Sequence, residues 1–484
     1  MCNTRFQSYF CFSVLLLILP CCGVLSAQKV TVSNEINVRT NYAYDILPNI
    51  GENILFYHDR GSEHVFEIYD QNFRYKRTKE LFFEKKNAIV LGVTAQEEYF
   101  SMVYSYKDEG ISYIRINRYD AFAELIDSST LISEKSKILK TKHRFIHSDD
   151  KSKILLFAPS DGGVNLLLID NISLRLIFGF TLIHKDFNFK EDFKKILVNN
   201  NGEVFIAGKK DNYFNRKNKD AVMCLKITGP DGISTHVIHS DELMIHNLML
   251  AYDPINDRII FSGLVGKSDD ASSSGYFMQS FSGSAIPVES KINPNFFSLD
   301  FLSEFYGKKP GKVKELTGFS CRDMVIRKDG GVILITELQK QFTRRAPMTT
   351  TGRFGEFVST RGFIDYYHED IILLAMYPDG REHWKRILFK KQFSQDDDGI
   401  FSSYFLFKTP SRMRLVYNDE IKNNNTVSEY VIDPVGNYER NSVLSTEYQN
   451  LKLRFRDAIQ IAPNSIIVPS EKSFKINMVR IDYN

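Results

Sequence analysis

Short runs of aromatic and β-branched residues, each roughly five to ten residues long, recur along most of this chain. Two early examples are 53–58 and 64–69, and each is followed by a turn sequence rich in Asp, Asn, Gln or Gly. Such runs are typical of strands that pack on a pleated surface, and Asp-Gly or Asn-Gly pairs are typical of tight hairpins. Convincing helical periodicity is almost absent. The pattern therefore predicts an all-β protein.

A unit of four such runs repeats along the chain. In its clearest copy, 323–337 contains two strands around an Asp-Gly-Gly turn, and 370–380 and 383–388 supply the third and fourth strands. Four antiparallel strands per repeat, over a chain of this length, predict the blades of a single β-propeller. This copy begins near Phe319, and further copies begin near Ala88, His143, Phe193, Ile245 and Phe401.

The two ends of the chain bear on the number of blades. An early segment, 34–83, forms a further unit, whereas the tail, 451–483, offers only three strands. A three-stranded last blade would leave an open edge, and open edges invite aggregation. The segment 28–33 could supply the missing strand. This closure favours eight blades over seven, which stays the alternative.

The repeats resemble the β-propeller architecture at large, over nearly the whole chain. The Trp-Asp dipeptides of WD repeats, the paired glycines of kelch repeats and the Ser-x-Asp-x-Gly-x-Thr-Trp turn of sialidases do not recur. The chain is similar instead to uncharacterised secreted bacterial propellers. That resemblance implies a fold but no particular function.

The first 27 residues have the pattern of a cleavable secretory signal. Arg5 precedes an apolar run at 10–19, and Ala27 is a small residue placed for cleavage. Because that run is well short of the ~20 residues that span a bilayer, a permanent anchor is not expected. The predicted organisation is a signal peptide at 1–27 followed by one propeller domain at 28–484.

An exported chain would be periplasmic, cell-surface or extracellular. Lipid attachment at Cys21 or Cys22 is the less favoured alternative, because Pro20 and the lack of small residues upstream make a poor lipobox. Of the six cysteines, only Cys224 and Cys321 lie beyond the leader. That count excludes a disulfide-stapled scaffold and leaves open whether these two pair.

The net charge of the chain bears on which classes of binding partner to expect. The whole chain carries +3, which falls to +2 without the leader, so the balance gives no reason to expect nucleic-acid binding. No segment after the leader is apolar enough to cross a membrane. We expect a monomer whose partner is an unidentified protein or an extracellular ligand.

Two insertions interrupt the repeats. The first, at about 293–314, contains an apolar stretch from Phe296 to Phe305 in which Phe297, Leu299, Phe301, Leu302 and Phe305 could largely share one helical face. We expect a helix that packs across the propeller, with a membrane-surface or partner-binding helix as the alternative.

The second insertion, at about 338–368, interrupts the hairpin of the most regular repeat and is locally basic. Arginine recognises carboxylate and phosphate groups through two parallel hydrogen bonds, and long loops on a rigid scaffold often bind ligands. A solvated loop with an ordinary charge excess is the competing interpretation. The functional hypothesis is an anion or acidic-glycan site formed by Glu337, Arg344, Arg345, Arg353, Arg361, Tyr367 and His368.

Other candidate residues give weaker signals. Trp384 could stack on a sugar, although a packed tryptophan is the commoner case. The run 395–399 has the acidic density of a calcium loop, with Asp396 and Asp398 as candidate ligands, but it lacks the EF-hand order. No metal-binding, nucleophile or phosphate-loop motif is present, so no catalytic residue, cofactor or other metal is predicted.

Three functions fit these observations. The favoured one is a non-catalytic exported propeller that binds a partner protein or an extracellular ligand, with an anionic glycan as one candidate. The second is an enzyme that processes glycans or other polymers at the mouth of the propeller channel. The third is a scaffolding component of the cell envelope.

Overall fold

The computed structural model describes residues 28–134, 142–160, 162–209, 221–267, 272–283, 285–345, 362–419, 426–444 and 450–483. The expected signal peptide, 1–27, lies outside the described residues and stays a prediction.

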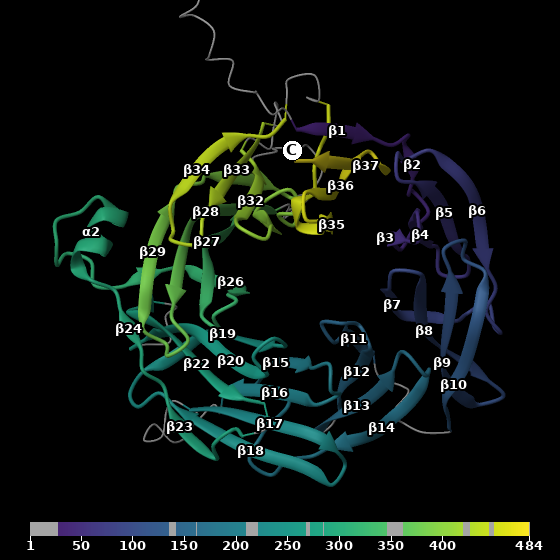
Figure 1. Ribbon diagram of the computed structural model, residues 1–484, viewed down its shortest axis with the longest axis horizontal. Helices are drawn as coiled ribbons and strands as arrows, with labels where there is room; N and C mark the ends of the chain where they lie inside the picture. The colour runs from purple at the N-terminus through teal and green to yellow at the C-terminus, as the bar shows by residue number, and fades with distance from the viewer. Residues whose placement is uncertain are drawn as a thin grey trace, which may run out of the picture.

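Eight four-stranded antiparallel sheets stand around a central axis, which makes the fold a β-propeller with eight blades (Figure 1). In each blade the first strand in the chain is the innermost, except in blade 8, whose outermost strand comes from the N-terminal end. Blade 1 contains β3 (Ala43–Ile50), β4 (Asn53–Asp59), β5 (His64–Asp70) and β6 (Tyr75–Leu81), and blade 2 contains β7 (Ile89–Ala95), β8 (Tyr99–Asp108), β9 (Ile111–Asp120) and β10 (Leu125–Glu134). Blade 3 contains β11 (Arg144–His147), β12 (Lys153–Ser160), β13 (Gly163–Asp170) and β14 (Arg175–Leu182). Blade 4 contains β15 (Phe193–Val198), β16 (Val204–Lys209), β17 (Ala221–Gly229) and β18 (Gly232–His239).

The remaining blades follow the same order. Blade 5 contains β19 (Met244–Asp253), β20 (Arg258–Gly266), β22 (Gly275–Ser282) and β24 (Asn295–Phe296), and blade 6 contains β26 (Phe319–Ile326), β27 (Val332–Arg345), β28 (Gly362–Met376) and β29 (Glu382–Leu388). Blade 7 contains β31 (Tyr404–Lys408), β32 (Met413–Asn418), β33 (Val427–Ile432) and β34 (Tyr438–Ser442). Blade 8 contains β35 (Ile459–Ala462), β36 (Ser465–Lys472), β37 (Lys475–Asp482) and β1 (Lys29–Val32). Short accessory elements are β2 (Ile36–Asn37), β21 (Ser272–Ser273), β23 (Glu289–Lys291), β25 (Leu316–Thr317), β30 (Gln392–Gln395), α2 (Leu299–Tyr306) and the 3-10 turn η3 (Phe455–Asp457).

The ends of the chain close the ring. Strand β1 pairs antiparallel with β37, from Lys29 opposite Asp482 to Val32 opposite Val479. Ser33 extends the contact, because its hydroxyl accepts a hydrogen bond from the Met478 amide at 2.8 Å. The prediction that 28–33 completes the last blade is therefore confirmed, and the seven-bladed alternative is wrong.

Asp-Gly turns join strands within the blades, as in the pair β26–β27. Gly330 and Gly380 both have left-handed backbone conformations, with φ of 83° and 85°. Glycine adopts this conformation without steric cost, whereas a side chain there would be strained. At Gly380 a Cβ atom would also lie 2.6 Å from the carbonyl oxygen of Met278 in the neighbouring blade. These two glycines therefore allow tight turns.

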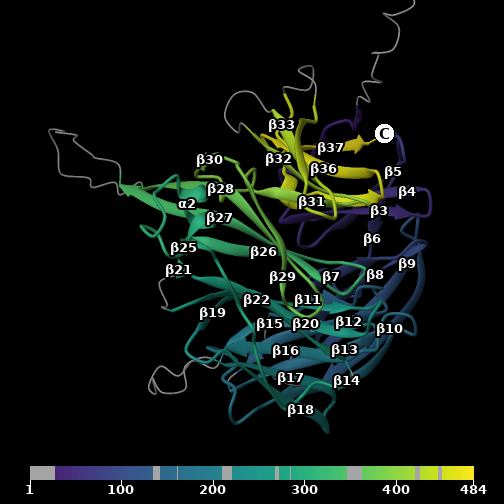
Figure 2. The same cartoon turned by 60° about the vertical axis from the view of Figure 1, so that its left-hand side comes forward.

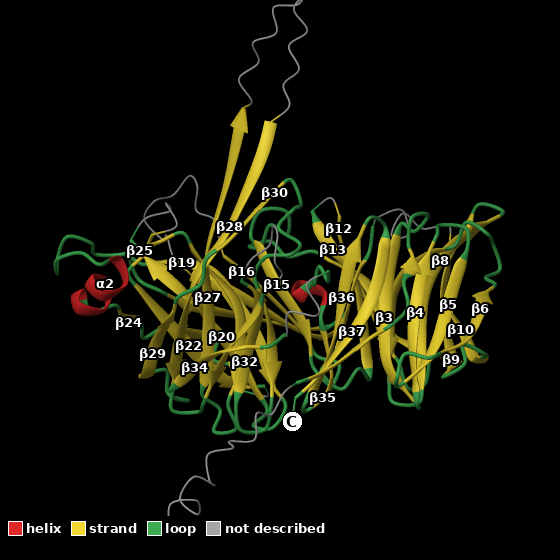
Figure 3. Ribbon diagram, turned by 90° about the horizontal axis from the view of Figure 1, so that it is seen from above, coloured by secondary structure: helices red, strands yellow, loops and turns green. Residues whose placement is uncertain are grey.

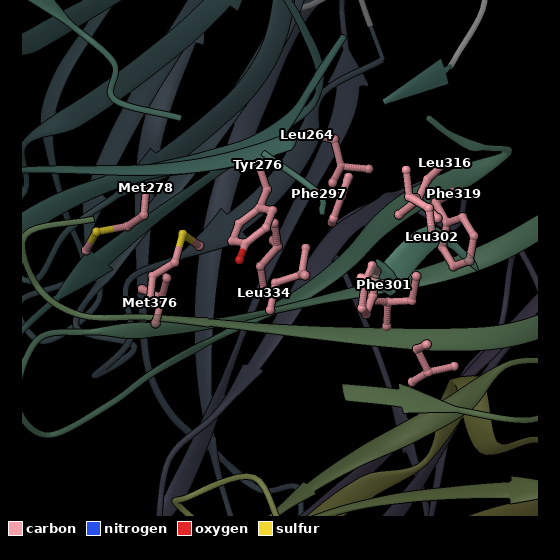
Figure 4. Packing of buried hydrophobic residues seen from close by; sticks show 14 of the residues in the cluster. Leu264, Tyr276, Met278, Phe297, Phe301, Leu302, Leu316, Phe319, Leu334 and Met376 are labelled. Atoms are coloured by element: carbon pink, nitrogen blue, oxygen red, sulfur yellow. The ribbon is translucent and has the colours of Figure 1, made fainter. Parts of the chain in front are cut away.

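Apolar side chains fill the space between neighbouring blades. Figure 4 shows the cluster between blades 5 and 6, where Tyr276 and Leu264 of blade 5 face Leu334 and Met376 of blade 6. Each of these four side chains is almost completely buried. Since each well-buried apolar side chain contributes about 1.5–3 kcal/mol, these seams between blades supply much of the stability of the ring.

The first insertion forms the expected helix, but with shifted bounds. Helix α2 begins after Ser298, whose hydroxyl accepts a hydrogen bond from the Phe301 amide, and ends at Gly307 in a left-handed conformation. Phe301 and Leu302 are buried against blades 5 and 6. Leu299, expected on the same face, is 48% exposed, because the helix begins later than predicted and Leu299 lies in its first turn.

The second insertion does not leave the blade as a loop. Strands β27 and β28 continue past the edge of the ring as a two-stranded extension, which we call the arm (339–345 and 362–368) (Figures 2 and 3). A register shift next to Leu338 marks its start. Aromatic and β-branched residues continue in both strands, which explains why pairing persists. Residues 346–361 lie outside the described part of the chain.

The two cysteines beyond the leader do not form a disulfide bond. Cys224 and Cys321 are both free. Cys224 lies on β17 inside the seam between blades 4 and 5, where burial raises its pKa to about 12. Its thiol is therefore protonated at neutral pH and acts as a small apolar group.

Removing 28–33 should destabilise the whole ring. The deletion exposes an edge of β37 and the apolar contacts of Val30, so we expect a loss of about 2 kcal/mol in the free energy of unfolding. Urea unfolding of chains beginning at Gln28 and at Asn34 measures this loss. Lys29→Gln is the matched control, because it keeps the backbone pairing. Equal stability of the two chains would contradict the closure.

Candidate functional site

Glu337, a residue singled out from sequence, lies at the base of the arm and is completely buried. Its carboxylate contacts Lys390 at 2.8 Å, accepts a hydrogen bond from the Ser403 hydroxyl at 2.7 Å and lies 3.2 Å from Nδ1 of His368. The structure thus brings Glu337 and His368, both candidates from the sequence, into contact. Lys390 and Ser403 were not anticipated, because they reach the carboxylate from outside the insertion.

The same contacts connect blade 6 to blade 7. Lys390, also fully buried, donates hydrogen bonds to the carbonyl of His368 at 2.9 Å and to the side chain of Gln392 at 2.7 Å. Gln392 in turn donates to the carbonyl of Asn418 in blade 7 at 2.6 Å and accepts from the Ser403 amide at 2.8 Å. We call Glu337, His368, Lys390, Gln392 and Ser403 the charge cluster.

The neighbours of Glu337 favour its ionised form. Burial alone would raise the pKa of Glu337, but Lys390 and the hydrogen bond from His368 outweigh it and hold that pKa well below its usual range. Burial lowers the pKa of Lys390, and Glu337 opposes that shift. Removing either partner of such a buried pair leaves an uncompensated charge in the interior, which is strongly destabilising. The charge cluster is therefore a structural junction, with Glu337 closed off from solvent.

The arginines of the second insertion do not converge on this cluster. Arg344 lies on the arm, where its guanidinium donates to Asp365 at 2.8 Å. The side chain of Arg345 is not described, and Arg353 and Arg361 lie outside the described residues. Of the four arginines predicted to bind an anion, the structure places only the Arg344 side chain, and it is paired with a carboxylate of its own hairpin.

Two aromatic residues accompany Tyr367 on the arm. Its ring lies 5.7 Å from that of Phe342 and 5.1 Å from that of Phe393 on β30. Offset and edge-to-face contacts at these separations stabilise aromatic pairs. Tyr367 thus helps to hold β30 against the arm.

Trp384 is placed by packing between blades. Its side chain is 6% exposed, and its indole nitrogen donates to the Pro434 carbonyl at 3.1 Å. A Cβ atom at Gly436 would lie 2.6 Å from the indole ring, which shows how closely the backbone of blade 7 covers it. The ring face needed to stack on a sugar is therefore occupied.

The acidic run supports the arm. Asp396 accepts a hydrogen bond from the Ile364 amide at 2.8 Å, and Asp398 accepts one from the Tyr366 hydroxyl at 3.0 Å. Both aspartates have left-handed backbone conformations. Among the described residues, no three His, Cys, Asp or Glu side chains are grouped so that they could hold a metal ion.

A site that sequence reasoning missed lies in the wall of the central channel. A pocket of about 450 Å³ opens between the innermost strands of blades 6 and 7, β26 and β31, and the 3-10 turn η3, which precedes the innermost strand of blade 8. We call it the channel pocket. Its lining consists of Arg322, Asp323, Tyr404, Phe405, Leu406, Lys408, Phe455, Arg456 and Ala458.

The channel pocket has an excess of positive charge. Arg322, Lys408 and Arg456 provide three cations against the single carboxylate of Asp323. Arg322 points back toward Glu337, with 3.7 Å between Nε and Oε2, and so connects the pocket lining to the charge cluster behind it. Lys408 and Arg456 are exposed and make no ion pair within the described ranges.

Tyr404 supplies a neutral donor to the same pocket. Its hydroxyl donates to Asp323 at 2.8 Å, and burial, followed by the nearby carboxylate of Asp323, raises its pKa well above the usual value. The phenol therefore stays protonated. No local motif reveals this set, because its members come from three repeats and meet only through the register of the blades.

No protein-family profile matches this chain, and no curated protein matches it either. Similar solved structures include the Dos1 propeller (10% identity, 93% of this chain and 94% of that one, TM-score 0.45). They also include the polysaccharide lyase Uly1 (8%, 81% and 89%, 0.38) and the Nup133 β-propeller domain of Vanderwaltozyma polyspora (12%, 82% and 100%, 0.37). At these identities the likeness concerns the fold alone.

Among the described residues, no helix is both long and apolar enough to span a membrane.

Replacing Lys390 should destabilise the junction between blades 6 and 7. In Lys390→Met the Glu337 carboxylate stays buried without its main cation, so we expect a loss of about 3 kcal/mol in the free energy of unfolding at pH 7. Adding Glu337→Gln removes the other charge and should recover part of that loss. Urea unfolding measures both effects.

The pH dependence of the free energy of unfolding tests the same contacts independently. Because the pKa of Glu337 is depressed in the fold, its contribution is present above its ordinary pKa of 4.5 and is lost as pH falls below that value. The double variant should show a shallower loss of stability in that range. Lys391→Met, at the exposed neighbouring lysine, is the control. A Lys390→Met protein as stable as this control would contradict the role of the charge cluster.

Proposed function

We propose that this chain is an exported propeller that binds an anionic ligand in the channel pocket without transforming it, with an acidic glycan as the ligand class. The observation that supports this proposal most directly is the lining of the pocket, with three cations against one carboxylate. A volume of about 450 Å³ lies within the usual range for small-ligand sites.

The lining matches both parts of an acidic sugar. Arginine and lysine side chains bind carboxylate groups through charge-assisted hydrogen bonds. Phe405 and Leu406 are half-buried and add an apolar surface suited to the carbon face of a sugar ring. The ligand would therefore lie with its carboxylate toward Lys408 and Arg456 and its ring against β31.

The ionisable side chains that line the channel pocket favour ligand binding over glycoside hydrolysis. Glycoside hydrolysis usually requires two carboxyl groups on either side of the scissile bond. Among the described lining residues, only Asp323 has a carboxyl group, and it accepts the hydrogen bond of Tyr404. The raised pKa of Tyr404 also makes its phenol a poor base at neutral pH.

A binding measurement tests the ligand class. We expect an oligogalacturonate to bind and a neutral oligosaccharide of equal length to bind at least tenfold more weakly. Lys408→Gln combined with Arg456→Gln should lower the affinity for the acidic oligosaccharide about tenfold or more, since each substitution removes a charged donor. Isothermal titration calorimetry at two salt concentrations measures this, and higher salt should weaken binding.

The control for this experiment is Arg39→Gln combined with Lys185→Gln, which removes two exposed cations elsewhere on the ring. Arg322 is left intact because it contacts Glu337. Equal losses in both double variants would show a general effect of net charge and would contradict a site in the channel pocket. Equal affinity for acidic and neutral oligosaccharides would contradict the ligand class.

Export is tested separately. We expect the full-length chain, expressed with a C-terminal tag in a bacterial host, to be recovered outside the cytoplasm with Gln28 as its first residue. N-terminal sequencing of the recovered protein measures the cleavage site. A chain that keeps residues 1–27 in the cytoplasm would contradict export, and a lipid-modified Cys21 or Cys22 would support the lipoprotein alternative.

A further inference from the structure

A second pocket lies at the seam between blades 6 and 7, on the opposite face of the ring from the arm. It is formed at the β26–β27 and β31–β32 turns and next to the end of β33, and its volume is about 470 Å³. We call it the seam pocket. Its lining consists of Val325, Ile326, Arg327, Lys328, Asp329, Ile333, Thr409, Pro410, Ser411, Arg412, Met413, Ile432, Asp433 and Pro434.

The interior of the seam pocket is aliphatic. Ile333, Met413 and Ile432 are buried, and Val325 and Ile326 are half-buried beside them. Two prolines add apolar surface, and no aromatic ring is part of the lining. An interior of this kind suits a flexible hydrocarbon chain, because dispersion and the hydrophobic effect act on it without directional demands.

Both acidic residues at the rim are engaged by the protein itself. Asp329 pairs with Arg327 at 2.7 Å and accepts a hydrogen bond from the Gly331 amide at 3.0 Å. Asp433 accepts from the amides of Val435 and Asn437, at 3.0 and 2.8 Å. These carboxylates therefore hold the turns and leave little negative charge to satisfy other cations.

Two cationic residues at the rim, unlike Arg327, have no carboxylate partner among the residues that the structure describes. Lys328 and Arg412 are exposed, and neither makes an ion pair within the described parts of the chain. They come from the β26–β27 turn of blade 6 and the β31–β32 turn of blade 7, so they stand on the two sides of the seam. A cationic rim around an aliphatic interior complements a molecule with an anionic head and an apolar tail.

We propose that the seam pocket binds a medium-chain acyl carboxylate, with its hydrocarbon chain against Val325, Ile333 and Met413 and its carboxylate at Lys328 and Arg412. The aliphatic lining favours an acyl chain over an aromatic body. This site is separate from the channel pocket, shares no lining residue with it and does not depend on the proposed function.

The sequence contains a reporter for this site. Trp384 is the single tryptophan of the chain, and its indole nitrogen donates to the carbonyl of Pro434, a residue of the pocket lining. A ligand that shifts the turn at Pro434 changes the surroundings of the indole. Tryptophan fluorescence therefore reports occupancy of the seam pocket without a label.

The test is a titration of the full chain with decanoate, decanol and acetate below the micellar concentration, followed by Trp384 fluorescence and calorimetry. We expect decanoate to bind with a 1:1 stoichiometry, decanol to bind about tenfold more weakly and acetate not to bind at the same concentrations. Equal affinity for decanoate and decanol would overturn the role of the cations, and absence of decanoate binding would overturn the proposal.

Two variants locate the site. Lys328→Gln combined with Arg412→Gln should reduce the affinity for decanoate to that for decanol, and Val325→Phe, which fills part of the interior, should weaken both ligands at least tenfold. The Arg39→Gln and Lys185→Gln double variant is the charge-matched control. Unchanged decanoate binding in the Lys328 and Arg412 double variant, whose substitutions are exposed and keep the fold, would overturn the site even if Val325→Phe is unstable.

Discussion

The closure of the last blade by β1 is the contact on which the rest of the ring depends. Each blade covers an apolar face of the next one, so the seams exclude water only if the ring is complete. Blade 8 draws three strands from the C-terminal end and its outermost strand from the N-terminal end, and the β1–β37 pairing keeps blade 8 next to blade 1 (Figure 1). Both pockets border on blade 7, and the channel pocket also extends to blade 8.

The junction between blades 6 and 7 contains an ion pair at one end, in which both side chains are completely buried. Glu337 and Lys390 bind across the base of the arm, and the apolar cluster that contains Ile335 and Trp384 continues toward the opposite face. A buried pair needs its partners held in place, because removing either one leaves an uncompensated charge. The charge cluster thus fixes one end of this seam, and the seam pocket lies at the opposite end.

Much of the fold could be predicted because its signals are local. Alternating apolar runs and Asp-Gly turns indicate strands, and the start of blade 4 at Phe193 agrees with the structure to the residue. The arm was misjudged as a loop, since its basic residues concealed a strand pattern that continues through Phe342 and Ile364. Glu337 and His368, both candidates from the sequence, lie in contact, whereas Lys390 was not a candidate because nothing local marks a lysine that becomes buried.

By itself, the sequence determined that the chain is all-β, that its repeats are propeller blades and that its first strand completes the last one. Periodicity and turn chemistry act over a few residues, so they can be read before folding. Only the tertiary structure decided which cations share a pocket, because Arg322 and Lys408 lie on strands of two blades and Arg456 lies in the turn before a third. The seam pocket likewise exists only after the turns of blades 6 and 7 are packed side by side, since both its apolar interior and its cations are drawn from these two repeats.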